Sequence, residues 1–205
     1  MNSPICFARG GLAVAGLAVA GLALVALPGL TVEAGASEPY GVLPAQTHTP
    51  RSFEFRLGVY GHDPVSPEHG SIDVNGELLF DPFRADRSTL RGVLLPRLHA
   101  GVSVNTDGKT SQIYGGLTWT WNLTPRVFVE AGFGGAAHNG KTGVLPIPGF
   151  NAMGCGWGFH EQGSLGYRLT DAWSVMVTVE HTSNSGICSH NRGMTNVGMR
   201  MGYSF

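Results

Sequence analysis

The sequence predicts an all-β protein, an eight-stranded antiparallel up-and-down transmembrane β-barrel. Three observations predict it: regular alternation of apolar and polar residues, the length of the alternating segments, and a chain that ends on an aromatic residue, Phe205. The segments are about eight to twelve residues long, close to the 9–11 residues that a tilted strand needs to cross a bilayer. Their even number is what a closed bacterial barrel requires.

The composition agrees with an exterior that faces lipid. Charged residues make up 13% of the 205 residues, which is low for a soluble surface, and glycine is abundant at 31 residues. The formal net charge of −1 gives no reason to expect a nucleic-acid partner. Beyond the N-terminal segment, no apolar run approaches the ~20 residues of a membrane-spanning helix.

Three regions are predicted along the chain. Residues 1–36 have the pattern of a secretory signal peptide, with a positive charge, an uncharged apolar run and a cleavage site at Ala34-Gly35-Ala36. A transmembrane anchor is the alternative for this segment. Residues 37–51 are rich in proline, threonine and glycine and predict a flexible lead-in. Residues 52–205 are predicted to form the barrel.

The first four strands are predicted from apolar residues at every second position. They cover residues 53–60, 71–80, 93–104 and 111–121. A polar loop with two prolines separates the first pair, and a charged connector separates the second and third strands. Pro96 weakens the start of the third strand. The run Asn105-Thr106-Asp107-Gly108 predicts a tight turn before the fourth strand.

The last four strands follow the same alternation. They cover residues 126–137, 159–169, 173–183 and 194–205. A short turn precedes the first of them, and Thr170-Asp171-Ala172 forms another between the sixth and seventh strands. The loops at 138–158 and 184–193 are longer, and each holds one cysteine. Loops therefore alternate between short and long, as in outer-membrane barrels.

The polar face of the strands carries four acids and four bases that can pair inside a barrel. A soluble β-sandwich has the same period and is the alternative, but the alternating loops, the even strand count and the terminal aromatic favour the barrel. The inward-facing charged residues are Glu54, Arg56, Glu77, Arg97, Glu130, Arg168, Glu180 and Arg200.

A histidine and a serine stand out at the end of the seventh predicted strand. His181 and Ser183 are two residues apart, so they share the apolar face of that strand. With short turns and the C-terminus in the periplasm, this strand ends at the cell surface. The pair then faces the lipopolysaccharide of the outer leaflet. A serine nucleophile needs a neighbouring base and donors for an oxyanion, and Asn184 could supply one donor.

These residues resemble a known family of enzymes. The run His181-Thr182-Ser183-Asn184, the following Asn191-Arg192-Gly193 and the last strand resemble the lipid A 3-O-deacylase (acyloxyacyl hydrolase) family of outer-membrane barrels. The resemblance extends over residues 102–140 and 159–205. It implies removal of the ester-linked acyl chain at the 3 position of lipid A by serine, histidine and glutamate, without a metal or other cofactor.

By this resemblance Ser183 is the nucleophile and His181 the general base. Asn184 would help to bind the oxyanion, and Asn191 matches a family asparagine in the following loop. The family acid lies twelve residues after the serine, where this chain has Thr195. A threonine carries no charge to stabilise an imidazolium, so the acid comes from elsewhere, or activity is weak or absent.

Strand pairing offers a substitute acid. If Leu169 pairs with Trp173 across the turn, Glu161 lies opposite His181, and we hypothesise that Glu161 orients its ring. Glu161 is the only acid on the lipid-facing side of the sixth strand, where a carboxylate is costly without a partner. The rival, Glu180, adjoins His181 but points inward by alternation.

Several alternatives stay open from the sequence. His181 and Ser183 could be polar anchors at the membrane interface, in a non-catalytic barrel with a structural or adhesive role. Cys155 and Cys188 predict one disulfide in an exported chain, with two free thiols as the alternative. No histidine or cysteine spacing predicts a metal site. The predicted location is the bacterial outer membrane, and the predicted partner is lipid A within lipopolysaccharide.

Overall fold

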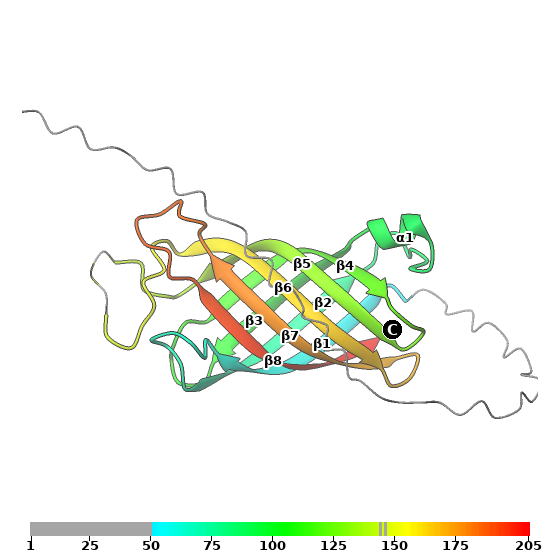
Figure 1. The fold of residues 1–205 in the computed structure, drawn as a ribbon, viewed down its shortest axis with the longest axis horizontal. Coiled ribbons are helices and arrows are strands. Elements are labelled where there is room, and N and C mark those ends of the chain that lie inside the picture. The colour runs from blue at the N-terminus through cyan, green and yellow to red at the C-terminus, as the bar shows by residue number, and fades with distance from the viewer. Residues whose placement is uncertain (1–50, 144, 146) are drawn as a thin grey trace, which may run out of the picture. The chain divides into compact units, whose positions relative to one another are not determined.

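In a computed structural model of the chain, residues 51–143, 145 and 147–205 are described. They form a closed barrel of eight antiparallel strands in which each strand pairs with the next and β8 pairs with β1 (Figure 1). The predicted fold class is confirmed. The strands are β1 (Phe53–His62), β2 (Ser71–Phe80), β3 (Arg97–Asn105), β4 (Gln112–Asn122), β5 (Val127–His138), β6 (Trp157–Arg168), β7 (Trp173–Ser183) and β8 (Met194–Ser204).

The predicted signal peptide and all but the last residue of the predicted lead-in lie outside the described residues. Strand β7 has the bounds that alternation predicted, and β2 does too. The start predicted for the third strand was wrong, because a short helix, α1 (Leu90–Leu94), occupies the connector. Thr89 caps this helix by accepting a hydrogen bond from the Gly92 N–H. The strand then begins after Pro96, which has no N–H to donate to a neighbour.

Side chains alternate between the two faces of the barrel wall. Apolar residues on the outer face are about half exposed, as Leu57 (55%), Leu165 (52%) and Val177 (51%) illustrate. Polar residues at the intervening positions are buried inside. In a soluble protein these exposures would be reversed, so the outer face matches a surface covered by lipid. No helix in the part of the chain that the structure describes is long and apolar enough to cross a membrane.

The predicted pairing of acids and bases fills the interior near the end of the barrel that carries the C-terminus. Arg56 is fully buried and donates to Glu54 at 2.7 Å, to Glu130 at 2.8 Å and to Glu77 at 3.3 Å. Arg97 adds ion pairs of 2.5 Å to both Glu54 and Glu130. These bonds link four strands, β1, β2, β3 and β5, and close the interior with side chains.

Three other predicted inward charges have different surroundings. Arg200 pairs with Glu77 at 2.9 Å, as expected. Arg168 was expected to pair with an acid, but it lies at the end of β6, donates to the Asn122 side chain at 2.7 Å and stacks on Phe128. The Glu180 carboxylate lies 3.6 Å from His160 Nε2 and accepts hydrogen bonds from three neutral donors. Those donors are Ser103, Gln112 and Asn196.

The two ends of the barrel differ. The long loops that follow β5 and β7 lie at one end, whereas α1, the turn after β6 and the C-terminus lie at the other (Figure 1). Cys155 and Cys188 form the predicted disulfide between those two long loops, with Cα atoms 6.0 Å apart. Ser183 ends β7 at the long-loop end, so the predicted catalytic pair lies at the same end of the barrel as these loops.

Candidate active site

Three residues form a line across three neighbouring strands near the long-loop end, and Ser183 lies two residues further along the middle strand. His181 on β7 pairs directly with Glu161 on β6 and with Thr195 on β8. The predicted register between Glu161 and His181 is therefore confirmed. Ser183 lies two residues beyond His181 on the same outer face. His181, Ser183 and Thr195 are partly exposed, and Glu161 is exposed.

The His181 ring is held from the β8 side. Its Nδ1 lies 2.8 Å from the Thr195 hydroxyl oxygen, so the residue at the family acid's position does contact the histidine. The hydrogen bond expected from Glu161 is not present: within the described residues, Glu161 makes no hydrogen bond or ion pair with His181. The reason is geometric, because the nitrogen that an orienting acid would hold is already bonded to Thr195.

Gly193 makes room for this ring orientation. A Cβ at position 193 would lie 2.9 Å from His181 Cε1 and 3.3 Å from its Nε2, which is too close for a side chain. Residue 193 also has a φ of 70°, in the left-handed region that glycine adopts most readily. The ring therefore packs against bare backbone at the start of β8.

Glu180 is not available to the histidine. Alternation places its side chain inside the barrel, where it is buried and accepts hydrogen bonds from the interior donors named above. The prediction that Glu180 points inward is confirmed. No group of three or more His, Cys, Asp or Glu residues within the described ranges could hold a metal ion.

Asn184 supports the loop after β7. Its side-chain Nδ2 donates to the Met153 carbonyl at 2.7 Å and to the His190 carbonyl at 2.6 Å, and its Oδ1 accepts from Gly186 N–H. Both amide protons are thus in use inside a buried environment. Oxyanion binding by this side chain, the other role expected for it, would require one of these bonds to break.

Asn191 is better placed to donate to a substrate. Its Oδ1 accepts from the backbone N–H of Asn184 at 2.8 Å, which fixes the amide group next to the residue that follows Ser183. No partner for its Nδ2 is found in the described part of the chain. Asn191 is exposed, and it lines a cavity of about 320 Å³ on the β8 side of the histidine. The cavity is bounded by Asp63, Val65, Ser66, Asn191, Arg192, Gly193 and Thr195.

Comparison with known proteins identifies the family. The family described as lipid A 3-O-deacylase (PagL) matches residues 32–204, which is most of the chain. The chain belongs to the lipid A 3-O-deacylase family. No curated protein matches the sequence.

Solved structures agree with the fold of this lipid A 3-O-deacylase family member. The outer membrane enzyme PagL is 17% identical, with a TM-score of 0.58 over 74% of this chain and 99% of that one. Neisserial surface protein A is 7% identical, with a TM-score of 0.52 over 75% and 96% of the two chains. A de novo designed transmembrane β-barrel is 12% identical, with a TM-score of 0.50 over 76% and 97%.

Family membership gives the protein its location and class. It is an outer-membrane β-barrel, its family consists of ester hydrolases, and the family substrate is lipid A. The lipid-facing position of His181 and Ser183 agrees with a substrate that stays in the bilayer.

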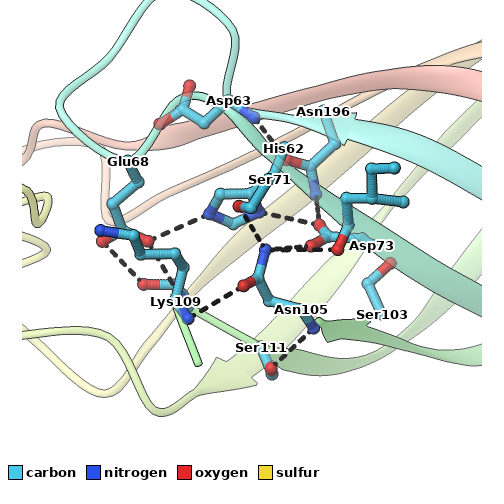
Figure 2. Close-up of polar contacts among 12 residues, drawn as sticks. His62, Asp63, Glu68, Ser71, Asp73, Ser103, Asn105, Lys109, Ser111 and Asn196 are labelled. Atoms are coloured by element: carbon cyan, nitrogen blue, oxygen red, sulfur yellow. Dashed lines mark hydrogen bonds and ion pairs between the residues drawn. The ribbon is translucent and has the colours of Figure 1, made fainter. Parts of the chain in front are cut away.

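The loops after β1, β3 and β5 of this lipid A 3-O-deacylase family member are joined by a hydrogen-bond network that the sequence did not reveal (Figure 2). His62 lies between Asp73 at 2.9 Å and Glu68 at 3.0 Å. Glu68 also accepts from the backbone N–H groups of Thr110 and Asn151, both at 2.8 Å. Burial alone would raise the pKa of Glu68, but the hydrogen bonds from His62, Asn151 and Thr110 outweigh it and lower that pKa to about 2.

This network reaches the start of β8 through Asn151 and Asp63. The Asn151 side chain donates to the Gly193 carbonyl at 3.1 Å and to the Asp63 carboxylate. Asp63 in turn accepts from the Thr195 N–H at 3.1 Å. The only sequence signal for Asp63 was its place directly after β1, and its relation to β8 depends on closure of the barrel between first and last strands.

Proposed function

We propose that this outer-membrane protein hydrolyses the ester that links an acyl chain to the 3 position of lipid A, with Ser183 as nucleophile and His181 as general base. The contact between His181 Nδ1 and Thr195 supports this proposal most strongly. It fixes the ring on the lipid-facing surface, beside a serine two residues further along the same strand.

The tautomer follows from this contact. For Nε2 to accept a proton, Nδ1 must carry one and donate it to the Thr195 oxygen. Ser183 Oγ then attacks the ester carbonyl carbon as its proton passes to Nε2. The resulting oxyanion accepts from Asn191 Nδ2, whose amide is anchored by Asn184. No hydrogen bond joins Ser183 to His181 among the described residues, and in free enzymes such bonds often shorten only with substrate.

The second half of the reaction returns the enzyme to its starting state. The tetrahedral intermediate collapses, and the C–O bond to the sugar breaks as His181 Nε2 gives its proton to the leaving alkoxide. Water then attacks the acyl-Ser183 ester, and the same nitrogen takes a proton from the water. The acyl–oxygen bond to Ser183 then breaks, His181 Nε2 gives that proton to the serine oxygen, and the fatty acid is released.

Thr195 orients the His181 ring but carries no charge. The imidazolium formed in the transition state must therefore be stabilised by nearby carboxylates. Glu161 is one strand away from His181 on the side opposite Thr195. We propose that its charge favours the imidazolium through space. Glu161 is exposed, so water and headgroup ions screen this contribution.

Thr195→Glu is expected to raise kcat by about tenfold or more, because a carboxylate bonded to Nδ1 stabilises the imidazolium better than a neutral hydroxyl. The measurement is the rate of fatty-acid release from purified lipid A in mixed micelles. Thr195→Val is the control: it removes the hydroxyl, keeps the shape and should lower kcat. Equal rates for all three proteins would show that His181 Nδ1 plays no part.

The proposed function is tested by mass spectrometry of lipid A from cells that express the chain. Wild type should remove the mass of one hydroxyacyl group, and a Ser183→Ala variant present at the same level in the outer membrane should not. Unchanged lipid A with both proteins would contradict the esterase proposal. It would favour a non-catalytic barrel with a structural or adhesive role.

A further inference from the structure

The family acid is replaced by a threonine, yet a buried carboxylate lies directly behind that threonine. Pairing between β1 and β8 runs as far as Gly61 opposite Val197, and extending it by two residues sets Asp63 beside Thr195. The structure agrees. The Asp63 Oδ1 accepts from the Thr195 N–H at 3.1 Å, and the Asp63 N–H donates to the Asn196 side chain at 3.1 Å.

We propose that Asp63 is a positioning residue for the deacylation reaction, and that its negative charge, held beside the Thr195 backbone, favours the His181 imidazolium through space in place of the charge that Thr195 lacks. This inference rests on the proposed function. Asp63, which directly follows β1, lies beside Thr195 on β8, and Thr195 lies opposite His181 on β7. Neighbouring strands are about 4.7–4.9 Å apart, so the Asp63 and His181 backbones are separated by two such spacings.

In the described part of the chain, the Asp63 carboxylate is buried and hydrogen-bonded only to neutral groups. Its side chain is 3% exposed, so water screens it little. Its carboxylate accepts from two neutral donors, the Thr195 N–H and the Asn151 amide. Among the described residues it forms no ion pair, although Arg192 lines the same cavity. An imidazolium at His181 would be a cation on the other side of Thr195.

Asp63 is also held in a conformation that few residues accept. Its φ is 39°, in the left-handed region where aspartate and asparagine are enriched among residues with a side chain. Asp63→Asn therefore keeps the backbone conformation, the size and an oxygen for the Thr195 N–H, and it removes the charge together with the oxygen that accepts from Asn151. Alanine would change all of these together and is a poorer test.

Charge and structure are separated by measuring Asp63→Asn in two backgrounds, wild type and Thr195→Glu. In wild type, kcat is expected to fall roughly ten- to fiftyfold with little change in KM, the range that Coulomb's law gives for unit charges about 7–12 Å apart at an effective dielectric constant near 20. In the Thr195→Glu background, where the acid is at position 195 again, the same substitution should change kcat by less than about threefold.

A matched control removes a buried carboxylate at the opposite end of the barrel. Asp81 is 5% exposed and pairs with Arg87 at 2.5 Å, so Asp81→Asn should leave kcat unchanged. Folding of every variant is checked by the shift in gel migration on heating that folded barrels show. The kcat of Glu161→Gln is measured as well, because the Glu161 carboxylate lies on the side of His181 opposite Thr195.

Each outcome decides between the proposals. An unchanged kcat for Asp63→Asn, or an equal loss in both backgrounds, would overturn the role of its charge. Loss of activity with Glu161→Gln but not with Asp63→Asn would assign the charge to Glu161. If wild type were inactive and Thr195→Glu active, the role of the Asp63 charge would be refuted and the proposed function would stand. Activity that survives Ser183→Ala, or no activity in any variant, would instead refute the proposed function.

Discussion

Ser183→Ala and His181→Ala are each expected to lower the rate of deacylation by roughly 10³-fold or more, and the double variant should be no slower than either single one. The serine and the histidine act in one step, since the proton that leaves the hydroxyl goes to the imidazole. Once either is removed, the other has no function left to lose. The measurement is kcat/KM for fatty-acid release by the purified barrels.

Additive losses would contradict this prediction. If the double variant were slower than both single variants by the product of their effects, the two side chains would contribute independently, as in substrate binding. Thr182→Val is a useful control. It replaces the hydroxyl between the two residues, which points inward to the Gln112 side chain, and so tests whether local disturbance of β7 alone lowers the rate.

The second large effect concerns stability. Arg56→Met is expected to lower the free energy of unfolding by about 3–5 kcal/mol, the usual cost of removing one partner from a buried charge cluster. Arg56 contacts three carboxylates, and its removal leaves Arg97 and Arg200 to balance Glu54, Glu77 and Glu130 inside the barrel. Urea unfolding in lipid vesicles, followed by tryptophan fluorescence, gives this free energy.

Arg168→Met is the matched control for this measurement. Arg168 lies at the end of β6 near solvent and donates to Asn122 and to the Pro125 carbonyl. The expected loss is below about 1 kcal/mol, as for exposed polar contacts. If both variants lost the same stability, the interior cluster would contribute no more than a surface contact.

Much of the barrel could be predicted because alternation sets which way each side chain points. The partner of His181 on β6 was also predictable, since the three-residue turn after Leu169 fixes the register and leaves Glu161 opposite. The role of Thr195 was less accessible. A threonine at the position of the family acid suggested lost activity. Thr195 nevertheless lies on β8 opposite His181 and keeps a hydrogen bond to the histidine ring.

The loop contacts could not be predicted, for a physical reason. Glu68 bonds to residues that follow it by 42 and 83 positions, and each contact depends on how separate loops fold over one rim. Alternation carries no information about such segments. Asp63 was hidden for a related reason, because its neighbour Thr195 lies 132 residues away and meets it only when the sheet closes.

The disulfide between Cys155 and Cys188 has a consequence for the integrity of the protein. The two cysteines lie on either side of β6 and β7, so the bond turns that hairpin into a covalent ring with a sequence separation of 33. Glu161, His181 and Ser183 are all members of this ring. A protease that cut the chain once at the Thr170-Asp171-Ala172 turn would leave two polypeptides still joined by sulfur. The proposed general base and nucleophile would stay in one molecule with β6, the strand that pairs with theirs.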